Sequence, residues 1–136
     1  MLKQMDTQLY FGNHIDAYQE DMLRDLARLI AIPSVCGKPE GKYPYGKKSA
    51  EALELILSMA KEMGFDTVNA DYYAGHAEYG EGEEIAAVLA HVDVVPTGDG
   101  WNSDPFTLTR KGDLLFGRGT ADDKGKAALP LNAKLL

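Results

Sequence analysis

The sequence contains one cysteine, Cys36, so the chain cannot close an internal disulfide. It also has no apolar run that approaches the roughly 18–20 residues needed by a helix that crosses a bilayer. Its first residues show no positively charged segment followed by an apolar one, which is the pattern of a secretory signal peptide. Together these absences predict a cytoplasmic chain without disulfides and without a membrane span.

Positive charge is in short supply as well. The chain has 14 lysines and arginines against 21 aspartates and glutamates, which gives a formal net charge of −7. This balance argues against nucleic acid or an anionic membrane surface as a partner. The content of 45% hydrophobic and 26% charged residues is typical of a globular protein, and 136 residues suffice for one core but not for two full domains.

Apolar spacing predicts two amphipathic helices in the first half of the chain. One runs over residues 16–32 and ends before Pro33, because the residue that precedes a proline disfavours the helical conformation. The other runs over residues 49–63, and Gly64 follows it at the place of a left-handed C-cap. The loop between them, residues 34–48, contains glycine, proline and lysine and predicts no regular structure.

Strands are predicted in the second half. Residues 65–70 should pair with residues 72–79 in one hairpin, and residues 106–110 with residues 114–117 in another. Between the hairpins, the apolar run at residues 85–90 predicts a buried central strand, because it is short and is followed by a loop containing proline and glycine.

The predicted central strand ends in His91-Val92-Asp93. Side chains alternate along a strand, so His91 and Asp93 should project from the same face. An imidazole and a carboxylate in this arrangement fit two chemistries: both bind a metal ion, or one binds it and the other orients the ligand. In either case we expect an Asp93 oxygen within hydrogen-bond reach of the His91 ring.

A second polar motif, Asp122-Asp123, lies between Gly119 and Gly125, where the backbone can turn sharply and approach an ion closely. Each motif alone has an ordinary explanation, since acidic pairs often cap helices and most histidines at strand ends bond a carbonyl or water. Their combination, with a glycine- and proline-containing loop between them, predicts half of a metal site. Trp101 in that loop either walls a substrate cleft or pins the loop to the core.

These motifs resemble those of a known family. The stretch HVDVVPTGDGW at residues 91–101, followed by GRGTADDKG at residues 117–125, resembles the signature of the cocatalytic di-zinc aminoacylase, carboxypeptidase and dipeptidase family. Upstream, residues 29–37 and 71–84 resemble its bacterial dipeptidase V branch, the Xaa-His or carnosinase-like dipeptidases. The resemblance covers nearly all of residues 15–125. It implies an α/β fold, with a mixed sheet and flanking helices, as in the N-terminal part of a zinc-dependent exopeptidase catalytic domain.

The resemblance also implies roles for particular residues. His91 is expected to be a ligand of one metal ion, Asp93 the catalytic carboxylate that orients His91, and Asp122 the bridge between two metal ions. The peptide between Asp122 and Asp123 is expected to be cis or strained. The implied cofactor is a pair of zinc ions, although manganese or cobalt would suit the same donors. The implied reaction is hydrolysis of a small peptide by a metal-activated water.

The sequence departs from the family in two places. Pro130 falls inside the helix expected from Lys124 onward, so that helix should be shortened, kinked or restarted. The family's glutamate pair, its remaining ligands and its lid or dimerisation domain correspond to positions beyond Leu136. The resemblance therefore implies an incomplete metallopeptidase catalytic domain over residues 1–136, the N-terminal fragment of a metal-dependent dipeptidase, inactive alone and prone to self-association through its exposed surface.

Two other functions stay open. The chain could be a naturally short, non-catalytic metal- or peptide-binding module derived from the same family. It could also be an unrelated mononuclear metal- or phosphate-binding domain that uses the glycine-rich loop. This last hypothesis is the weakest, because no helix N-terminus follows a phosphate-binding glycine pattern.

Overall fold

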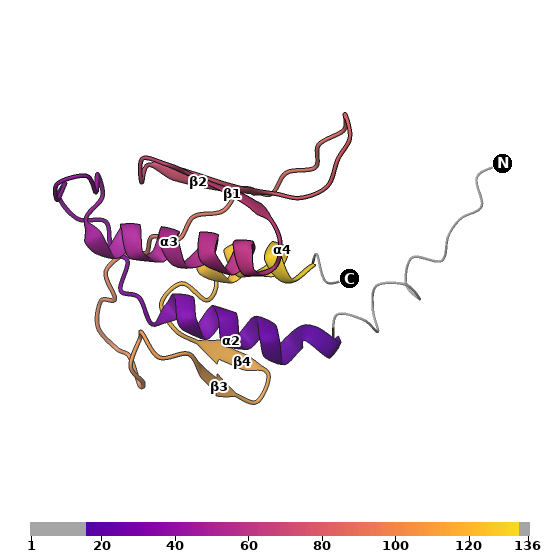
Figure 1. Cartoon of the computed structure of the whole chain (residues 1–136). Helices are drawn as coiled ribbons and strands as arrows, with labels where there is room; N and C mark the ends of the chain where they lie inside the picture. Colours follow the sequence, from indigo (N-terminus) through magenta and orange to yellow (C-terminus); the bar gives the residue numbers. More distant parts are fainter. Residues whose placement is uncertain (1–15, 134–136) are drawn as a thin grey trace.

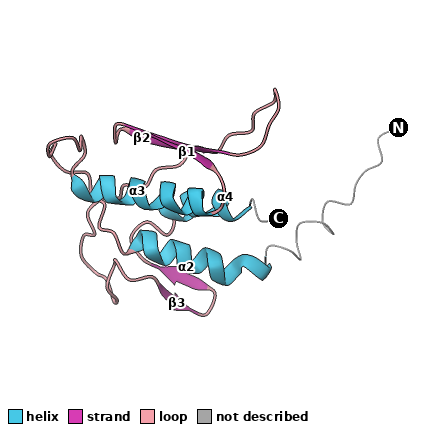
Figure 2. Ribbon diagram, in the orientation of Figure 1, coloured by secondary structure: helices cyan, strands magenta, loops and turns pink. Residues whose placement is uncertain are grey.

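The computed structural model describes residues 16–133 and arranges helices and two short hairpins in layers (Figures 1 and 2). Figure 1 shows one hairpin over α3 on one side of the molecule and the other hairpin against α2 on the opposite side. This combination of helices and strands confirms the predicted α/β class, although the described strands form two separate antiparallel pairs and not one mixed sheet. The elements in chain order are η1 (Asp16–Tyr18), α2 (Gln19–Ile30), α3 (Lys47–Glu62), β1 (Asp66–Ala70), β2 (Ala74–Glu78), β3 (Thr109–Lys111), β4 (Leu114–Phe116) and α4 (Lys124–Ala133).

Both predicted helices of the first half are confirmed, with small shifts at their ends. The helix α2 ends at Ile30, three residues before Pro33, as expected from the steric effect of the proline. The helix α3 begins at Lys47, after Gly46 with φ 85°. It ends where Gly64, with φ 82°, donates its N–H to the carbonyl of Lys61 at 2.9 Å.

The core lies where α2, α3 and α4 meet. Its members are aliphatic or small side chains at helical spacing, which lets the three helices approach closely, and burying each larger one stabilises the fold by about 1.5–3 kcal/mol. The β1–β2 hairpin closes one side of this core. The buried cluster is made of Leu29, Met59, Ala60, Ala128 and Leu131, and Phe65 and Ala77 pack against it.

The helix α4 continues through Pro130 and keeps all of its ten residues in helical conformation. Pro130 is only half-buried, whereas Ala127, Ala128 and Leu131 of the same helix are buried against the core. The packing of these neighbours explains how the helix tolerates a residue that cannot donate a backbone hydrogen bond. None of the helices in the described part of the chain is long and apolar enough to cross a bilayer.

Both predicted hairpins are confirmed as antiparallel pairs. In the first, Val68 lies opposite His76, and in the second Arg110 lies opposite Leu115. The first hairpin turns at Asp71 and Tyr72 with φ 52° and 63°, and the N–H of Tyr72 donates to Asn69 Oδ1 at 2.8 Å. This bond to the side chain helps to hold two non-glycine residues in a left-handed conformation.

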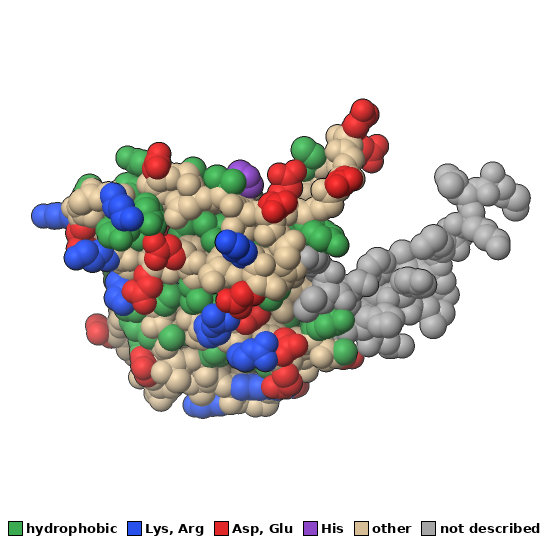
Figure 3. Space-filling view, viewed as in Figure 1, with side chains coloured by type: hydrophobic (Ala, Val, Ile, Leu, Met, Phe, Trp, Pro, Cys, Tyr) green, Lys and Arg blue, Asp and Glu red, His purple; other side chains and the backbone are tan. Residues whose placement is uncertain are grey.

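The predicted central strand at residues 85–90 is wrong: within the described residues this segment forms no strand, and it is exposed throughout. Leu89 is 98% exposed and Ile85 is 86% exposed. Backbone groups of a strand need a neighbouring strand to pair with, and the nearest pairing is the isolated parallel bridge between Val35 and Val94. The segment after β2 instead projects from the body of the molecule, and acidic side chains gather on it (Figures 1 and 3).

Candidate metal centre

The His91 ring joins the two sequence motifs. Its Nε2 lies 3.2 Å from Asp122 Oδ1, and its Nδ1 lies 3.1 Å from the backbone carbonyl oxygen of Asp93 and 3.2 Å from Asp93 Oδ1. The expected contact between His91 and an Asp93 oxygen is therefore confirmed, although His91 does not end a sheet strand. All three residues singled out from the sequence come together, across 31 positions of the chain.

The two aspartates lie on opposite edges of the imidazole. Because Nδ1 and Nε2 are separated by a ring carbon and point in different directions, a metal ion on one nitrogen cannot also be reached by a carboxylate on the other. In agreement with this, no group of three or more histidine, cysteine, aspartate or glutamate side chains within residues 16–133 is placed to hold one metal ion. Two donors, His91 Nε2 and Asp122 Oδ1, face one another.

The acidic pair presents its two carboxylates to different surroundings. Asp122 is exposed, whereas Asp123 is buried and accepts the backbone N–H of His91 on Oδ2 at 3.3 Å. The Lys126 ammonium lies 3.0 Å from Asp123 Oδ1. The peptide bond between Asp122 and Asp123 is cis, as the family resemblance implies. Asp123 therefore fastens the acidic turn to the backbone of His91 and leaves Asp122 free to contact its ring.

Charge in the site follows from these contacts. Partial burial lowers the pKa of His91, but the Asp93 carbonyl, the Asp122 carboxylate and the charges of both aspartates together raise it above its ordinary value of 6.5. The nearby Lys126 ammonium is the main cause that lowers the pKa of Asp123 from its ordinary value of 3.8, and the same ion pair raises the pKa of Lys126. The contacts of the site therefore stabilise the charged forms of Asp123 and of the His91 ring relative to their neutral forms.

A hydrogen bond from Ser34 holds the backbone between His91 and Asp93 in place. This serine is fully buried, and its hydroxyl donates to the carbonyl of Val92 at 2.6 Å. Its own carbonyl accepts the N–H of Val94 at 3.0 Å, next to the Val35–Val94 bridge. Sequence reasoning missed Ser34, and the only signal was its position in the LIAIPSVCG stretch that resembles the family.

The loop that follows Asp93 is held by Arg118, which sequence reasoning also missed. Arg118 Nη2 donates to the carbonyl of Thr97 at 2.7 Å, and its guanidinium lies 5.3 Å from the centre of the Trp101 ring. Trp101 Nε1 donates to the same Thr97 carbonyl at 2.9 Å. Of the two roles left open for Trp101, these contacts favour the one that pins the loop.

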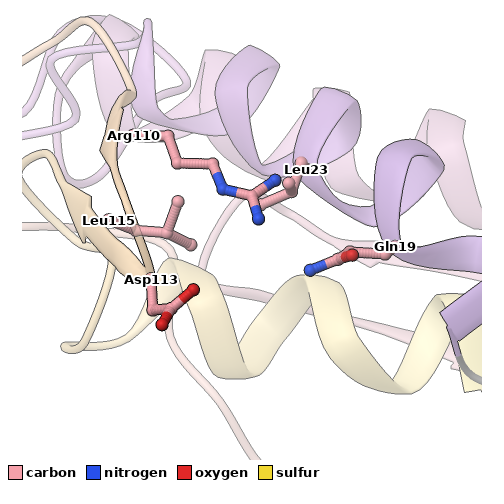
Figure 4. Close-up of a pocket in the computed structure, with 5 residues that line it drawn as sticks. All are labelled: Gln19, Leu23, Arg110, Asp113 and Leu115. Carbon is pink, nitrogen blue, oxygen red and sulfur yellow. The ribbon is translucent and has the colours of Figure 1, made fainter.

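Two hollows of the described surface lie away from His91. One, of about 170 Å³, opens between the start of α2 and the β3–β4 hairpin, and Figure 4 shows the side chains that line it, with the Arg110 guanidinium directed toward α2. The other, of about 340 Å³, lies among α2, α3 and α4. Neither is lined by a residue of the His91 site. The side chains of His91 and Asp122 are exposed by 49% and 78%, so the pair lies open on the described surface.

Comparisons with known proteins agree with the motifs. Residues 87–133, which include His91 and the acidic pair, match the model of peptidase family M20/M25/M40. The chain is 44% identical over 110 residues to the putative dipeptidase YtjP of Bacillus subtilis, an alignment that covers 79% of this chain and 24% of that protein. It is 39% identical over 131 residues to the Beta-Ala-Xaa dipeptidase of Lactobacillus delbrueckii subsp. lactis, covering 94% and 28%.

A solved structure shares the fold. Human carnosine dipeptidase 1 superimposes with a TM-score of 0.72 at 24% sequence identity, over 89% of this chain and 29% of that one. The chain spans about a quarter of the length of the relatives that it matches. The resemblance read from the motifs is confirmed, and the proteins that the chain matches over part of their length include ones named as dipeptidases.

Proposed function

The chain is related to the M20/M25/M40 peptidases, and we propose from this that it forms part of the catalytic domain of a metal-dependent dipeptidase. In this proposal His91 and Asp122 are metal ligands, and Asp93 is the carboxylate that orients His91. The observation that carries it is the His91 ring, contacted on Nε2 by Asp122 and on Nδ1 by Asp93.

The arrangement of the ring supports these separate roles. A histidine that binds a metal through Nε2 usually donates its Nδ1–H to a carboxylate or a backbone carbonyl, which fixes the tautomer and the ring orientation. Asp93 offers both kinds of acceptor within 3.2 Å of Nδ1. Asp93 is therefore the orienting partner, and the alternative in which His91 and Asp93 bind the same ion is disfavoured by the geometry.

The donors fit a zinc ion. Ligand atoms placed about 2.0–2.2 Å from a tetrahedral zinc are separated by about 3.4 Å, close to the 3.2 Å between His91 Nε2 and Asp122 Oδ1. Asp122 is exposed, so its second oxygen is available to a second ion, as a bridging ligand requires. Manganese and cobalt accept the same donors. When bound, the metal supplies Lewis acidity, which polarises a scissile carbonyl and lowers the pKa of a bound water.

For the whole protein we propose a small peptide as substrate. The support is the name of one relative, the Beta-Ala-Xaa dipeptidase, which is 39% identical to this chain over 131 residues. The chain's own residues hold and orient the metal ligands, but the described part brings no third histidine, cysteine or carboxylate to them, and this proposal assigns no general base to it. We therefore propose that residues 1–136 alone hydrolyse no dipeptide faster than free metal, since a general base contributes typically 10²–10⁴-fold.

Location and association belong to the same proposal. The single cysteine, the net charge of −7 and the sequence's lack of long apolar runs support a cytoplasmic location. Val88 and Leu89, exposed by 70% and 98%, lie on a segment whose backbone has no strand partner in the described structure. Such a segment supports self-association of the isolated chain.

The second candidate is a non-catalytic metal- or peptide-binding module. It is favoured by one observation, that only two metal donors converge within residues 16–133. The two candidates share the ligands but differ in what the site does, so binding and turnover must be measured separately.

The test combines zinc titration by calorimetry with a peptidase assay. We expect His91→Ala and Asp122→Asn each to weaken zinc binding more than tenfold, and Asp93→Asn to weaken it by about 10–100-fold as an orienting partner. Asp113→Asn, which changes an exposed aspartate in the β3–β4 turn, is the matched control and should bind as the unchanged chain does. Equal zinc affinity in all four variants would contradict the proposed ligands.

The assay uses β-Ala-His and Ala-His as substrates with Zn²⁺ and then Mn²⁺. We expect no turnover by the chain above that of the metal in buffer. Metal-dependent turnover that disappears in His91→Ala would show that the chain assembles a competent site by itself, against our proposal. Metal binding by a longer relative that likewise lacks turnover would favour the non-catalytic module.

A further inference from the structure

Lys124 is fully buried at the first position of α4, directly after the acidic pair. Its ammonium donates to the carbonyls of Leu29 and Ile32, at 2.7 Å in each case. Lysine is rarely buried unless its charge is paired or hydrogen-bonded. Here two carbonyl oxygens at and just beyond the C-terminal end of α2 accept the hydrogen bonds, where the helix dipole also favours a cation. Lys124 thus ties the acidic turn to the end of α2.

The space for Lys124 depends on Gly119. A Cβ on Gly119 would lie 3.0 Å from Lys124 Cδ and 3.1 Å from Val94 Cγ1, and Gly119 itself has φ +101°, which disfavours any side chain. The turn before the acidic pair therefore packs on the lysine stem and on the segment that carries His91 at the same time. Three parts of the chain meet at this glycine.

The same stretch that accepts the lysine also holds the other arm of the site. Ser34, two residues after Ile32, donates its hydroxyl to Val92 between His91 and Asp93. Residues 29–34 are thus a common support: Lys124 fastens the Asp122 arm to it, and Ser34 fastens the His91 arm. Besides the direct hydrogen bond from the His91 N–H to Asp123, these two attachments connect both arms to the same residues.

We propose that Lys124 is a positioning residue, which holds Asp122 against the His91 ring through its buried bonds to the end of α2. It touches neither proposed ligand atom and takes no part in chemistry. Its importance for metal binding rests on the proposed function. Its effect on geometry does not, because the contact between His91 and the acidic turn exists without metal.

The test is amide hydrogen exchange by NMR on the full metal-free chain. Lys124→Met keeps the length of the stem and removes the ammonium. We expect the His91 amide, which donates to Asp123, to lose protection at least tenfold, while amides inside α3 keep theirs. Lys61→Met, an exposed lysine of α3, is the matched control and should change neither. A residue that only stabilised the fold would lower protection everywhere by the same factor.

Two outcomes overturn the proposal. In a folded Lys124→Met chain, an unchanged His91 amide would show that Lys124 does not position the acidic turn. If Lys124→Met fails to fold, Lys124→Gln takes its place, since it keeps a hydrogen-bond donor but is one atom too short to donate to the carbonyls of both Leu29 and Ile32 as the ammonium does. The same local loss is then expected, and an unchanged amide or a uniform loss across the chain would contradict it. A wild-type chain that binds no zinc would sink the proposed function but leave this test intact.

Discussion

At the scale of single residues, the geometry of the site depends on the hydrogen-bond or ion-pair partner of each polar group. His91 has an aspartate on each ring nitrogen, and Asp123 accepts the backbone N–H of His91. Asp123 is buried and holds the acidic turn in place, whereas Asp122 and the His91 ring are accessible to solvent. Each of these contacts joins two identified side chains or backbone groups. Removing one partner should therefore change the pKa or the hydrogen exchange of the other.

The pKa of His91 provides the first prediction. Asp122→Asn removes a hydrogen-bonding carboxylate and its charge, so we expect the His91 pKa to fall toward its ordinary value of 6.5. The contribution of the ion pair to stability is present below pH 6.5 and is lost as the pH rises through the raised pKa of the folded chain. Titration of the histidine ring protons by NMR measures this. A His91 pKa that stays the same in Asp122→Asn would contradict the contact.

The pKa of His91 is raised, whereas that of Lys124 is lowered. Burial lowers its pKa from 10.5 to about 8, while the charge of Asp93 acts to raise it. Between pH 8 and 10.5 the unfolded chain binds the proton that the folded chain has released, so the stability of the fold should rise with pH across this window.

Urea unfolding at several pH values checks this prediction, with Lys124→Met as the comparison. We expect the rise in unfolding free energy between pH 8 and 10.5 to be present in the unchanged chain and absent in the variant. If the unfolding free energy of both proteins changed with pH in the same way, burial would not lower the pKa of Lys124.

At the scale of elements, the helices form the stable part of the fold. Leu29 is fully buried where the three helices meet, so we expect Leu29→Ala to cost about 2–5 kcal/mol of unfolding free energy. Leu129, also on α4, is 46% exposed, so Leu129→Ala is the matched control and should cost far less. Denaturant unfolding followed by circular dichroism compares them. Equal costs would mean that the core does not lie between these helices.

Local elements could be predicted from the sequence because their determinants are local. Periodic apolar residues, Pro33 and Gly64 gave α2 and α3, and turn residues gave both hairpins. The strand predicted at residues 85–90 is absent because a strand needs a second strand to pair with, and the described residues provide none. A local apolar pattern cannot show whether such a partner exists. The tolerance of Pro130 in α4 likewise depended on packing that no local pattern reports.

The site was predictable in part for the same reason. His91, Asp93 and Asp122 stand in motifs with a distinctive spacing, and their proximity is as expected. Ser34 and Lys124 act through backbone carbonyls more than 50 positions away, and such contacts leave no spacing in the sequence.

At the scale of the whole molecule, the exposed apolar segment at residues 85–89 has no strand partner among the described residues. Ile85, Val88 and Leu89 are exposed by 86%, 70% and 98%, on a backbone free to pair with another strand. We expect the isolated chain to self-associate at micromolar concentrations, and Leu89→Lys to shift it toward monomer. Sedimentation velocity measures both. If the wild-type chain sedimented as a monomer, this segment would not mediate self-association.

The most direct measurement of the central claim is a long-range ¹H–¹⁵N NMR spectrum of the histidine rings, recorded while zinc is added. If His91 and Asp122 are metal ligands, the Nε2 resonance of His91 should move with zinc, its Nδ1 should stay protonated against Asp93, and Asp122→Asn should abolish most of the effect. His76, on the exposed strand β2, is the internal control and should not respond. A His91 ring that ignores zinc, or that binds it through Nδ1, would contradict the account.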